Sequence, residues 1–564
     1  MPKASSYLRR GRSAAAATGL LLALAACNTA PTPSPSQAGL KSFTAIALLN
    51  HIRTLASDDF EGRAPGSRGE VQTLAYIQTQ FHAINLEPGN PDGTFLQKVP
   101  LVGITPDPAM RLTFAGGGKK LDLNFRSDFV AWTKRVSESV SADAEAIFVG
   151  YGAQAPEYQW DDFKGVDVKG KMLIVLVNDP GYEDQYLFGG KAMKYYGRWT
   201  YKYEKAAELG AAGCLIVHET GPAGYPWAVV AQKSGEQFDL VAPDKNAGRA
   251  AVEGWITSEQ AAKLFRLAGK DFAALKRAAL RGDFRPVPLG VKAQIVIHNK
   301  LREVQSYNLI AKLTGSDPKL RKEFVIYTAH WDHLGIGPEV NSDKIYNGAL
   351  DNASGVAALL EIARAYRQLE VPPRRSILFL SVTAEEQGLL GSRYYAENPL
   401  HPLTDTAAVI NMDVMNALGR TRDIVMIGRG NSTLDEVVDS AAHEQGRTVK
   451  GDPEPEKGYF YRSDHFEFSK QGVPAFYPGE GIEYIGRPEG WGLQMRERYV
   501  REDYHKPSDE VKQDWDLTGA VEDAQLYFLV GYRVANDPKF PQWKPGTEFK
   551  AKREAMMRAA GKGQ

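Results

Sequence analysis

The spacing of apolar positions divides the chain into three regions. Between Phe43 and Leu86 apolar residues recur every three or four positions, which predicts helices, and a loop rich in Gly and Pro at 58–66 interrupts them. From about 100 to 295 the apolar runs are short and separated by turn residues, which predicts strands. From about 305 onward, runs of strand length alternate with longer helical patterns.

The third region predicts the fold class. Strand-like runs occur at 324–327, 377–382 and 407–410, and a helical pattern occupies 356–366. Strands that alternate with helices form a largely parallel sheet covered on both faces. We therefore expect an α/β fold with a mixed, mostly parallel sheet and helices on both faces, plus a β-rich inserted region.

The length of 564 residues exceeds what one hydrophobic core usually supports, so two or more domains are expected. The predicted segments are a signal peptide (1–27), a flexible linker (28–42), an N-terminal helical part of the main domain (43–100), an inserted region (101–295), the α/β part of the main domain (296–540) and a C-terminal tail (541–564). For the tail, a frayed helix or disorder is expected rather than a function.

The first residues are typical of an export signal. A basic start precedes an apolar stretch, Ala14–Ala26, that is too short to remain in a bilayer as a helix. The sequence Leu24-Ala25-Ala26-Cys27 resembles the lipobox of bacterial lipoproteins, in which the cysteine carries the lipid. We therefore expect an exported protein anchored to the bacterial outer membrane through Cys27. A plain signal peptide, cleaved at an A-x-A-like site, is the alternative.

Composition and cysteine usage narrow the function only slightly. The chain has 68 basic and 68 acidic residues, so nothing in its overall charge favours a nucleic acid partner. Of the two cysteines, Cys27 belongs to the lipobox and Cys214 lies in an apolar run. A disulfide framework is thus excluded, and Cys214 is expected to be a buried structural residue rather than a nucleophile.

Polar residues that can bind metal follow the predicted strands. In open α/β sheets ligands bind outside the carboxyl ends of the strands, so these residues are expected to meet at one edge. They are His330, Asp332, Asp351, Glu385, Glu386, Asp413 and His505. So many acidic side chains would repel one another without cations, and a metal site resolves this conflict.

The donor types favour zinc, with cobalt or manganese as alternatives, because nitrogen and oxygen ligands are present without a thiolate. If five of these seven residues bind metal, they are too many for one tetrahedral zinc with an open position, but they fit two ions that share one carboxylate. Two such ions lower the pKa of a bridging water towards roughly 7. The pair Glu385-Glu386 supplies both a ligand and a base, since neighbouring side chains point in different directions.

Five motifs in order carry a resemblance to a known family. They are the segments 330–333 (HWDH), 351–355 (DNASG), 385–388 (EEQG), 411–413 (NMD) and 504–509 (YHKPSD). They resemble the di-zinc aminopeptidases of the secreted bacterial leucine aminopeptidase and aminopeptidase Y type, whose superfamily includes glutamate carboxypeptidase and the transferrin receptor. The resemblance covers about 305–535, the loop at 58–66 and the helices that flank this loop.

This resemblance implies a metal role for five residues. Asp351 would bridge two zinc ions. His330 and Asp413 would complete one zinc site, and Glu386 and His505 the other. The peptide bond between Asp351 and Asn352 is often cis in this family.

The resemblance also implies how peptide substrates would be hydrolysed. Glu385 would act as general base and then as the acid that protonates the leaving amine, a role that typically contributes about 10²–10⁴-fold. Asp332 would orient His330 through its second ring nitrogen. Tyr504 would hydrogen-bond the oxyanion of the tetrahedral intermediate.

The inserted region resembles a protease-associated domain. The segments that carry this resemblance are 148–152 (FVGYG), 161–165 (DDFKG), 168–171 (VKGK) and 204–213. Such domains usually cover or shape the substrate cleft, which is an analogy at the level of the fold.

Several alternatives stay open. A carboxypeptidase of the same superfamily needs cations for the terminal carboxylate, for which Arg462 and Arg487 are candidates, and a glutaminyl cyclase could use a similar metal cage. A tethered peptide-binding protein without catalysis is the alternative from another class. A serine hydrolase built on Ser463 and His465 lacks the G-x-S-x-G motif. His333 is expected in a loop or behind the ligands, and the oligomeric state is left open.

Overall fold

The computed structural model describes residues 37–232 and 235–562. The predicted signal peptide, Cys27 and most of the predicted linker lie outside these residues. Within the described ranges, every helix is too short or too polar to cross a membrane.

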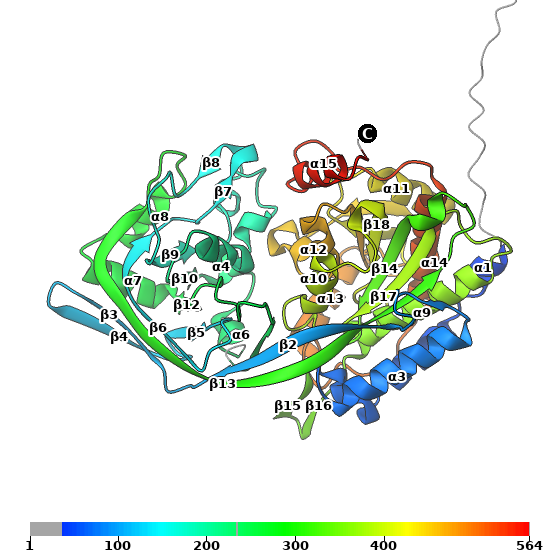
Figure 1. Cartoon of the computed structure of the whole chain (residues 1–564), viewed down its shortest axis with the longest axis horizontal. Helices are drawn as coiled ribbons and strands as arrows, with labels where there is room; N and C mark the ends of the chain where they lie inside the picture. Colours follow the sequence, from blue (N-terminus) through cyan, green and yellow to red (C-terminus); the bar gives the residue numbers. More distant parts are fainter. Residues whose placement is uncertain (1–36, 233–234, 563–564) are drawn as a thin grey trace, which may run out of the picture. The chain divides into compact units, whose positions relative to one another are not determined.

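The first of two sheets has the mixed topology expected from the sequence, with parallel strands at its centre (Figure 1). Its strand order is β11–β2–β13–β17–β14–β18–β21–β19–β20. The strands are β2 (Leu96–Pro106), β11 (Gln237–Leu240), β13 (Val287–Leu313), β14 (Phe324–His330), β17 (Ser376–Val382), β18 (Thr406–Asn411), β19 (Asp423–Ile427), β20 (Thr448–Gly451) and β21 (Ala475–Gly479), and the short β1 (Glu87–Pro88) also pairs with β13. The pairs β14–β17, β14–β18, β18–β21 and β19–β20 are parallel.

Helices cover both faces of this sheet. Every residue of β14 and β17 is buried, as expected for strands between two helical layers. One face packs on α2 (Ala45–Leu55), α3 (Arg68–Ala83), α9 (Ser354–Arg367), α11 (Leu434–Glu444) and α14 (Thr518–Asn536), and the other on α10 (Leu390–Glu397) and α12 (His465–Lys470). The short α1 (Gln37–Lys41) contacts α9, and α13 (Trp491–Glu502) precedes His505. The predicted α/β fold is confirmed.

The inserted region contains a second sheet with the order β4–β3–β13–β6–β9–β10–β12–β5. Its strands are β3 (Arg111–Gly116), β4 (Lys119–Asn124), β5 (Phe129–Trp132), β6 (Ser139–Phe148), β9 (Met172–Leu176), β10 (Gly213–His218) and β12 (Val252–Thr257), and its helices are α4 (Trp199–Glu208), α5 (Thr220–Ala223), α6 (Trp227–Gln232), α7 (Ser258–Leu267) and α8 (Phe272–Ala278). Cys214 lies in β10 and is fully buried, and burial raises the pKa of its thiol. This is the structural environment expected for that residue.

One strand belongs to both sheets. In β13, residues up to His298 pair with β3 and β6, Asn299–Leu309 pair with β2, and Leu309–Leu313 pair with β17 (Figure 1). The predicted boundary between residues 295 and 296 falls inside this strand.

The C-terminal tail differs from the expectation of fraying. Helix α15 (Lys550–Ala559) is formed, and its Arg553 is buried and donates to the carbonyl oxygens of Leu403 and Thr406 at 3.0 and 2.9 Å. Trp543, just before this helix, donates to the Gly472 carbonyl at 2.7 Å. These long-range contacts, which the polar local sequence does not reveal, hold the tail in place.

Candidate metal centre

The candidate metal ligands lie at the carboxyl ends of neighbouring strands. His330 is the last residue of β14, Glu385 and Glu386 follow β17, and Asp413 follows β18. Asp351 lies in the turn Ala349–Ala353 that leads into α9. Parallel strands bring these ends to one edge of the sheet, which is why residues so distant in sequence meet.

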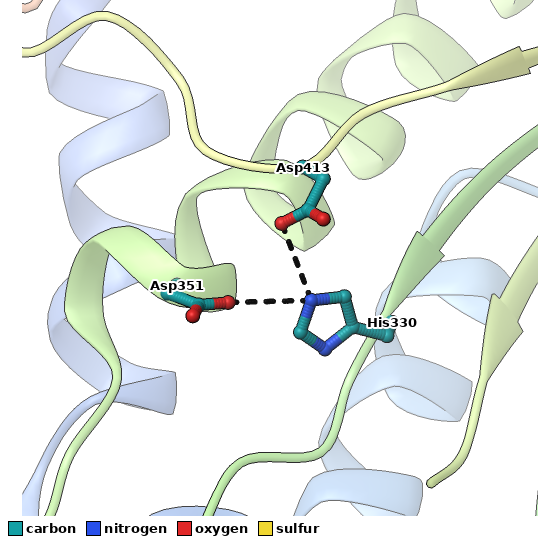
Figure 2. Close-up of side chains that lie close together, drawn as sticks. All are labelled: His330, Asp351 and Asp413. Atoms are coloured by element: carbon teal, nitrogen blue, oxygen red, sulfur yellow. Dashed lines mark hydrogen bonds and ion pairs between the residues drawn. The ribbon is translucent and has the colours of Figure 1, made fainter. Parts of the chain in front are cut away.

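The first group of ligands is centred on His330. Its Nε2 lies 3.3 Å from Asp351 Oδ1 and 3.3 Å from Asp413 Oδ1 (Figure 2). Burial alone would lower the pKa of His330, but the carboxylates of Glu385 and Asp413 outweigh it and raise this pKa well above its ordinary value. An imidazole and two carboxylates that converge in a buried position suit a divalent metal ion.

The second group shares Asp351. Nε2 of His505 lies 3.3 Å from Asp351 Oδ2 and 3.0 Å from Glu386 Oε2. Asp351 thus presents one oxygen to each group. Burial acts to raise the pKa of Asp351, but contacts with both imidazoles lower it to about 2. The structure therefore brings together all five residues that the resemblance implied as ligands, and their nitrogen and oxygen donors fit a metal.

His333 lies closer to this centre than the sequence suggested. Its ring is fully buried, and Nδ1 is 2.7 Å from Glu386 Oε1, on the opposite oxygen from His505. His333, Asp351 and Glu386 also converge closely enough to hold an ion. The spacing of three residues from His330 was the only signal in the sequence, and it does not reveal which way the loop turns.

Asp332 holds the backbone of the glutamate pair. Its carboxylate accepts hydrogen bonds from the N–H groups of Glu385 at 3.0 Å and Glu386 at 3.4 Å. His330 Nδ1 lies 3.1 Å from the Asp332 carbonyl oxygen and 3.7 Å from its Oδ1. The imidazole therefore contacts the main chain of Asp332 more closely than the carboxylate, because the carboxylate is engaged by two backbone donors.

Glu385 lies beside the ligands. Its Oε2 is 4.0 Å from His330 Nε2, and its side chain is 11% exposed, more than that of Glu386 at 3%. Burial raises the pKa of Glu385 well above its ordinary value, and the carboxylates of Asp413 and Glu386 add to this rise. A carboxylate that is accessible beside a metal centre is placed to accept a proton.

Tyr504 stacks on His505, with ring centroids 3.8 Å apart, and is 40% exposed. Although part of Tyr504 is exposed, burial around its phenol is the largest cause of a rise in its pKa, and the carboxylates of Asp351 and Glu386 add to it. The phenol is therefore protonated at neutral pH and can donate a hydrogen bond.

Ser463 supports the centre rather than forming a catalytic triad. Its hydroxyl donates to Asp413 Oδ2 at 2.7 Å and accepts from Asn411 Nδ2 at 2.7 Å. The ring of His465 instead stacks on Tyr477, with centroids 4.4 Å apart. The hydroxyl is thus engaged by a candidate ligand, and a serine hydrolase is not supported by this geometry.

Two buried residues outside the predicted set hold the loops of the centre. Arg63, in the turn Asp58–Arg63, donates to the carbonyl oxygens of four residues, Leu55, Trp331, Asn347 and Gly348, at 2.6–2.8 Å. Asp509 accepts from the N–H groups of Leu350 and Asp351 at 3.0 and 3.1 Å. Both residues lie in motifs that carry the resemblance, but their partners could not be read from the sequence.

The backbone turns sharply next to several ligands. Ala384, Val414 and His505 have φ between 53° and 66°, a region that residues with a side chain rarely adopt. Such conformations concentrate at functional sites, where the surrounding packing holds them. The Asp351–Asn352 peptide bond is cis, as the resemblance implied.

The comparisons with known proteins agree with this centre. Residues 308–529 match the model of Peptidase family M28. The chain is 33% identical to Aminopeptidase NAALADL1 of Mus musculus over 162 residues, which are 28% of this chain and 20% of that protein. It is 28% identical to Leupeptin-inactivating enzyme 1 of Streptomyces exfoliatus over 209 residues, which are 36% of this chain and 43% of that protein. It is 27% identical to a probable leucine aminopeptidase 2 of Aspergillus oryzae over 232 residues, which are 39% of this chain and 43% of that protein.

Among solved structures, an aminopeptidase from Aneurinibacillus sp. strain AM-1 aligns over 90% of this chain and 98% of that chain, with 20% identity and a TM-score of 0.49. The chain spans between a fifth and a little under half of the length of the curated relatives named above. The match to Peptidase family M28 covers β14, β17 and β18 and every candidate ligand, so the candidate metal centre lies within the part of this chain that is similar to that family.

Proposed function

We propose that this protein is a zinc-dependent exopeptidase that removes N-terminal residues from peptides. The observation that carries the proposal is the pair of ligand groups that share Asp351, with Glu385 beside the first group at 4.0 Å from His330 Nε2. The family match supports peptide hydrolysis, and the names of relatives that are aminopeptidases support the N-terminal preference.

Two zinc ions per chain are proposed as the cofactor. His330, Asp351 and Asp413 would hold one ion, and Asp351, Glu386 and His505 the other. When bound, they would polarise the scissile carbonyl and lower the pKa of a water towards roughly 7.

The chain's own residues would move the protons and fix the geometry. Glu385 accepts the proton of the attacking water at a carboxylate oxygen and then delivers it to the nitrogen of the leaving amine. Asp332 fixes the main chain of Glu385 and Glu386 through two N–H groups. The Tyr504 hydroxyl donates a hydrogen bond to the developing oxyanion.

The first test is hydrolysis of a panel of aminoacyl-nitroanilides, with and without a chelator, beside N-acetylated substrates and a C-terminal-release assay. The expected result is zinc-restorable cleavage of the free-amine substrates alone. Cleavage confined to C-terminal release would replace the proposal with a carboxypeptidase. Absence of cleavage in both assays, despite bound zinc, would favour a peptide-binding protein.

The variant Glu385→Gln tests the assignment of the base. It is expected to lower kcat by about 10²–10⁴-fold while the zinc content stays unchanged, because the amide cannot accept the proton. Glu397→Gln, an exposed position on α10, is the matched control and should keep full activity. If Glu385→Gln retains wild-type hydrolysis with zinc bound, another group is the base.

The proposal also covers the cellular location of the protein and the role of the inserted region. Export and a lipid anchor on Cys27 are proposed from the lipobox-like segment at 24–27. A protease-associated domain that shapes the substrate cleft is proposed for the insert, and its contacts with the peptidase around α12 support this. One such contact joins Lys470 Nζ to Glu204 at 3.1 Å, and another joins the rings of Tyr195 and Phe466 at 4.9 Å.

A further inference from the structure

Among the residues that the structure describes, Arg198 and Arg462 form no ion pair with an acidic side chain. Arg198 is the residue before α4 in the insert, and Arg462 lies between the turn Tyr459–Tyr461 and α12 in the peptidase region. Arg198 is buried and Arg462 is half-buried. Nε of Arg198 and both Nε and Nη2 of Arg462 are inaccessible to solvent and have no hydrogen-bond partner among the described residues.

Three other arginines of low exposure have partners for their charge. Arg375 pairs with Glu323 at 2.8 Å, Arg393 pairs with Asp239, and Arg63 donates to four carbonyl oxygens. Leaving a buried charged donor without a partner costs more than leaving a neutral one. Unpaired guanidinium nitrogens in a folded protein therefore call for a specific explanation.

The two guanidinium groups lie close enough to repel each other. Burial is the largest cause that lowers the pKa of Arg198, to about 10, and the charge of Arg462 is the next largest. The positive charges of both arginines also lower the pKa of Tyr225, although burial raises it overall. Nη2 of Arg462 lies 3.9 Å from where a Cβ on Gly224 would be, so it faces the insert. An anion between the two groups would satisfy their donors and remove the repulsion.

Arg462 adjoins the candidate metal centre in sequence. Arg462 is the neighbour of Ser463, whose hydroxyl donates to the candidate ligand Asp413 at 2.7 Å. Neighbouring Cα atoms are about 3.8 Å apart, and each extended residue of a peptide spans about 3.3–3.6 Å. A group held here is thus within a few residues of a peptide bond placed at the metal ligands.

We infer that Arg198 and Arg462 together bind a carboxylate on the leaving side of the peptide substrate. A guanidinium binds a carboxylate through two parallel hydrogen bonds, which suits the free nitrogens of both side chains. The α-carboxylate of a di- or tripeptide and the side chain of an acidic residue share this chemistry. The inference rests on the proposed peptidase function and assigns it a preference for short or acidic peptides.

The test compares Leu-Gly-Gly as the free acid, its C-terminal amide, and Leu-Asp-Gly amide. Wild-type protein is expected to show kcat/KM about 10–100-fold higher for a substrate with the carboxylate than for Leu-Gly-Gly amide. Selection of the free acid assigns the α-carboxylate, and selection of Leu-Asp-Gly amide assigns the acidic side chain. Equal values for all three substrates would overturn the inference.

Arg198→Gln and Arg462→Gln should each reduce this ratio towards 1, mainly through KM for the acid. Arg462→Lys keeps the charge but not the planar, forked set of donors, so it should keep part of the preference for the substrate with the carboxylate. Arg266→Gln, an exposed arginine of α7 in the insert, is the control and should keep the full ratio. Thermal midpoints of the Gln variants should equal or exceed that of wild type, since a repulsion is removed. A preserved ratio, or a lower midpoint with no change in ratio, would refute the assignment.

A binding measurement separates this inference from the proposed function. If no peptide is hydrolysed by the zinc-loaded protein, the proposed function fails, and calorimetric titration of the acid and the amide then decides the inference alone. Tighter binding of the acid by about 10-fold or more, lost in Arg198→Gln and Arg462→Gln, would support the carboxylate site. Equal binding of acid and amide would overturn it.

Discussion

Replacing Arg63 with methionine should destabilise the whole loop system of the metal centre. The guanidinium is 1% exposed and joins three segments, through Leu55, through Trp331 next to His330, and through Asn347 and Gly348 just before Asp351. Methionine has a similar length but no donor. Arg63→Met would therefore leave four carbonyl oxygens without their present partner.

The magnitude follows from these bonds and from the burial of the charge. Hydrogen bonds from a charged donor contribute about 1.5–3 kcal/mol each, so four would give about 6–12 kcal/mol if they were independent. Burial lowers the pKa of Arg63 from 12.5 to about 10, against the raising effect of Asp332 and other carboxylates. That shift corresponds to roughly 3 kcal/mol against the charged form. Bonds from one side chain are not additive, so we expect a loss of about 3–5 kcal/mol in the free energy of unfolding.

The assay is equilibrium denaturation of the zinc-loaded protein, together with competition for zinc against a chelator. Zinc affinity of Arg63→Met should fall by about 10–100-fold, as is typical when residues that orient metal ligands are lost. The stability and zinc affinity of Arg63→Lys should lie between those of wild type and Arg63→Met, because lysine keeps the charge but not the planar, forked set of donors. Arg68→Met is the matched control, since the Arg68 side chain is 68% exposed and pairs with the partly exposed Glu61 at 3.2 Å.

The free energy of unfolding of the control Arg68→Met should stay within about 0.5 kcal/mol of wild type, as is usual for substitutions at exposed positions. The reasoning would be refuted if Arg63→Met unfolded at the wild-type denaturant concentration and bound zinc as tightly. Such a result would mean that the three segments keep their positions without the guanidinium.

Three further predictions concern metal, acid stability and location. Chelation should lower the thermal midpoint and zinc should restore it, because a ligand at 1,000 times its Kd stabilises the folded state by about 4 kcal/mol; an unchanged midpoint would argue against a metal centre. Burial would raise the pKa of Asp239, but Arg393 and Arg249 lower it from 3.8 to about 2. Its stabilising contribution, about 2 kcal/mol, is therefore present above pH 4 and lost as the pH falls towards 2, and Asp239→Asn should abolish this part of the acid-unfolding curve. Cys27→Ser should move the protein from the membrane to the soluble fraction on cell fractionation; membrane retention would contradict the lipid anchor.

The fold and the set of candidate ligands could be predicted because both depend on local pattern. Apolar runs mark the buried strands β14, β17 and β18, and the residues after each run must meet at one edge of the sheet. His330, Glu386 and Asp413 illustrate this rule, since each lies at or just after a strand end.

Other features depend on contacts between distant segments, which no local pattern encodes. His333 contacts Glu386 only because the loop after β14 folds back, and Arg63 meets carbonyl groups more than 250 residues away in sequence. The approach of Arg198 to Arg462 depends in the same way on how the insert packs against the peptidase. Positive φ angles at Ala384 and Val414 are likewise imposed by their surroundings, since neither residue type favours them.

The shared strand β13 determines how the insert can be handled in protein engineering. Over 27 residues it supplies the partner of β3 and β6 in one sheet and of β2 and β17 in the other. Cutting the chain near residue 295 would therefore expose unpaired N–H and C=O groups in both halves, and such edges promote aggregation. The inserted region therefore cannot be removed or exchanged as a separate domain, because it shares β13 with the rest of the chain. A version trimmed to the domain that holds the candidate ligands would need a replacement for the missing stretch of strand before it could remain soluble.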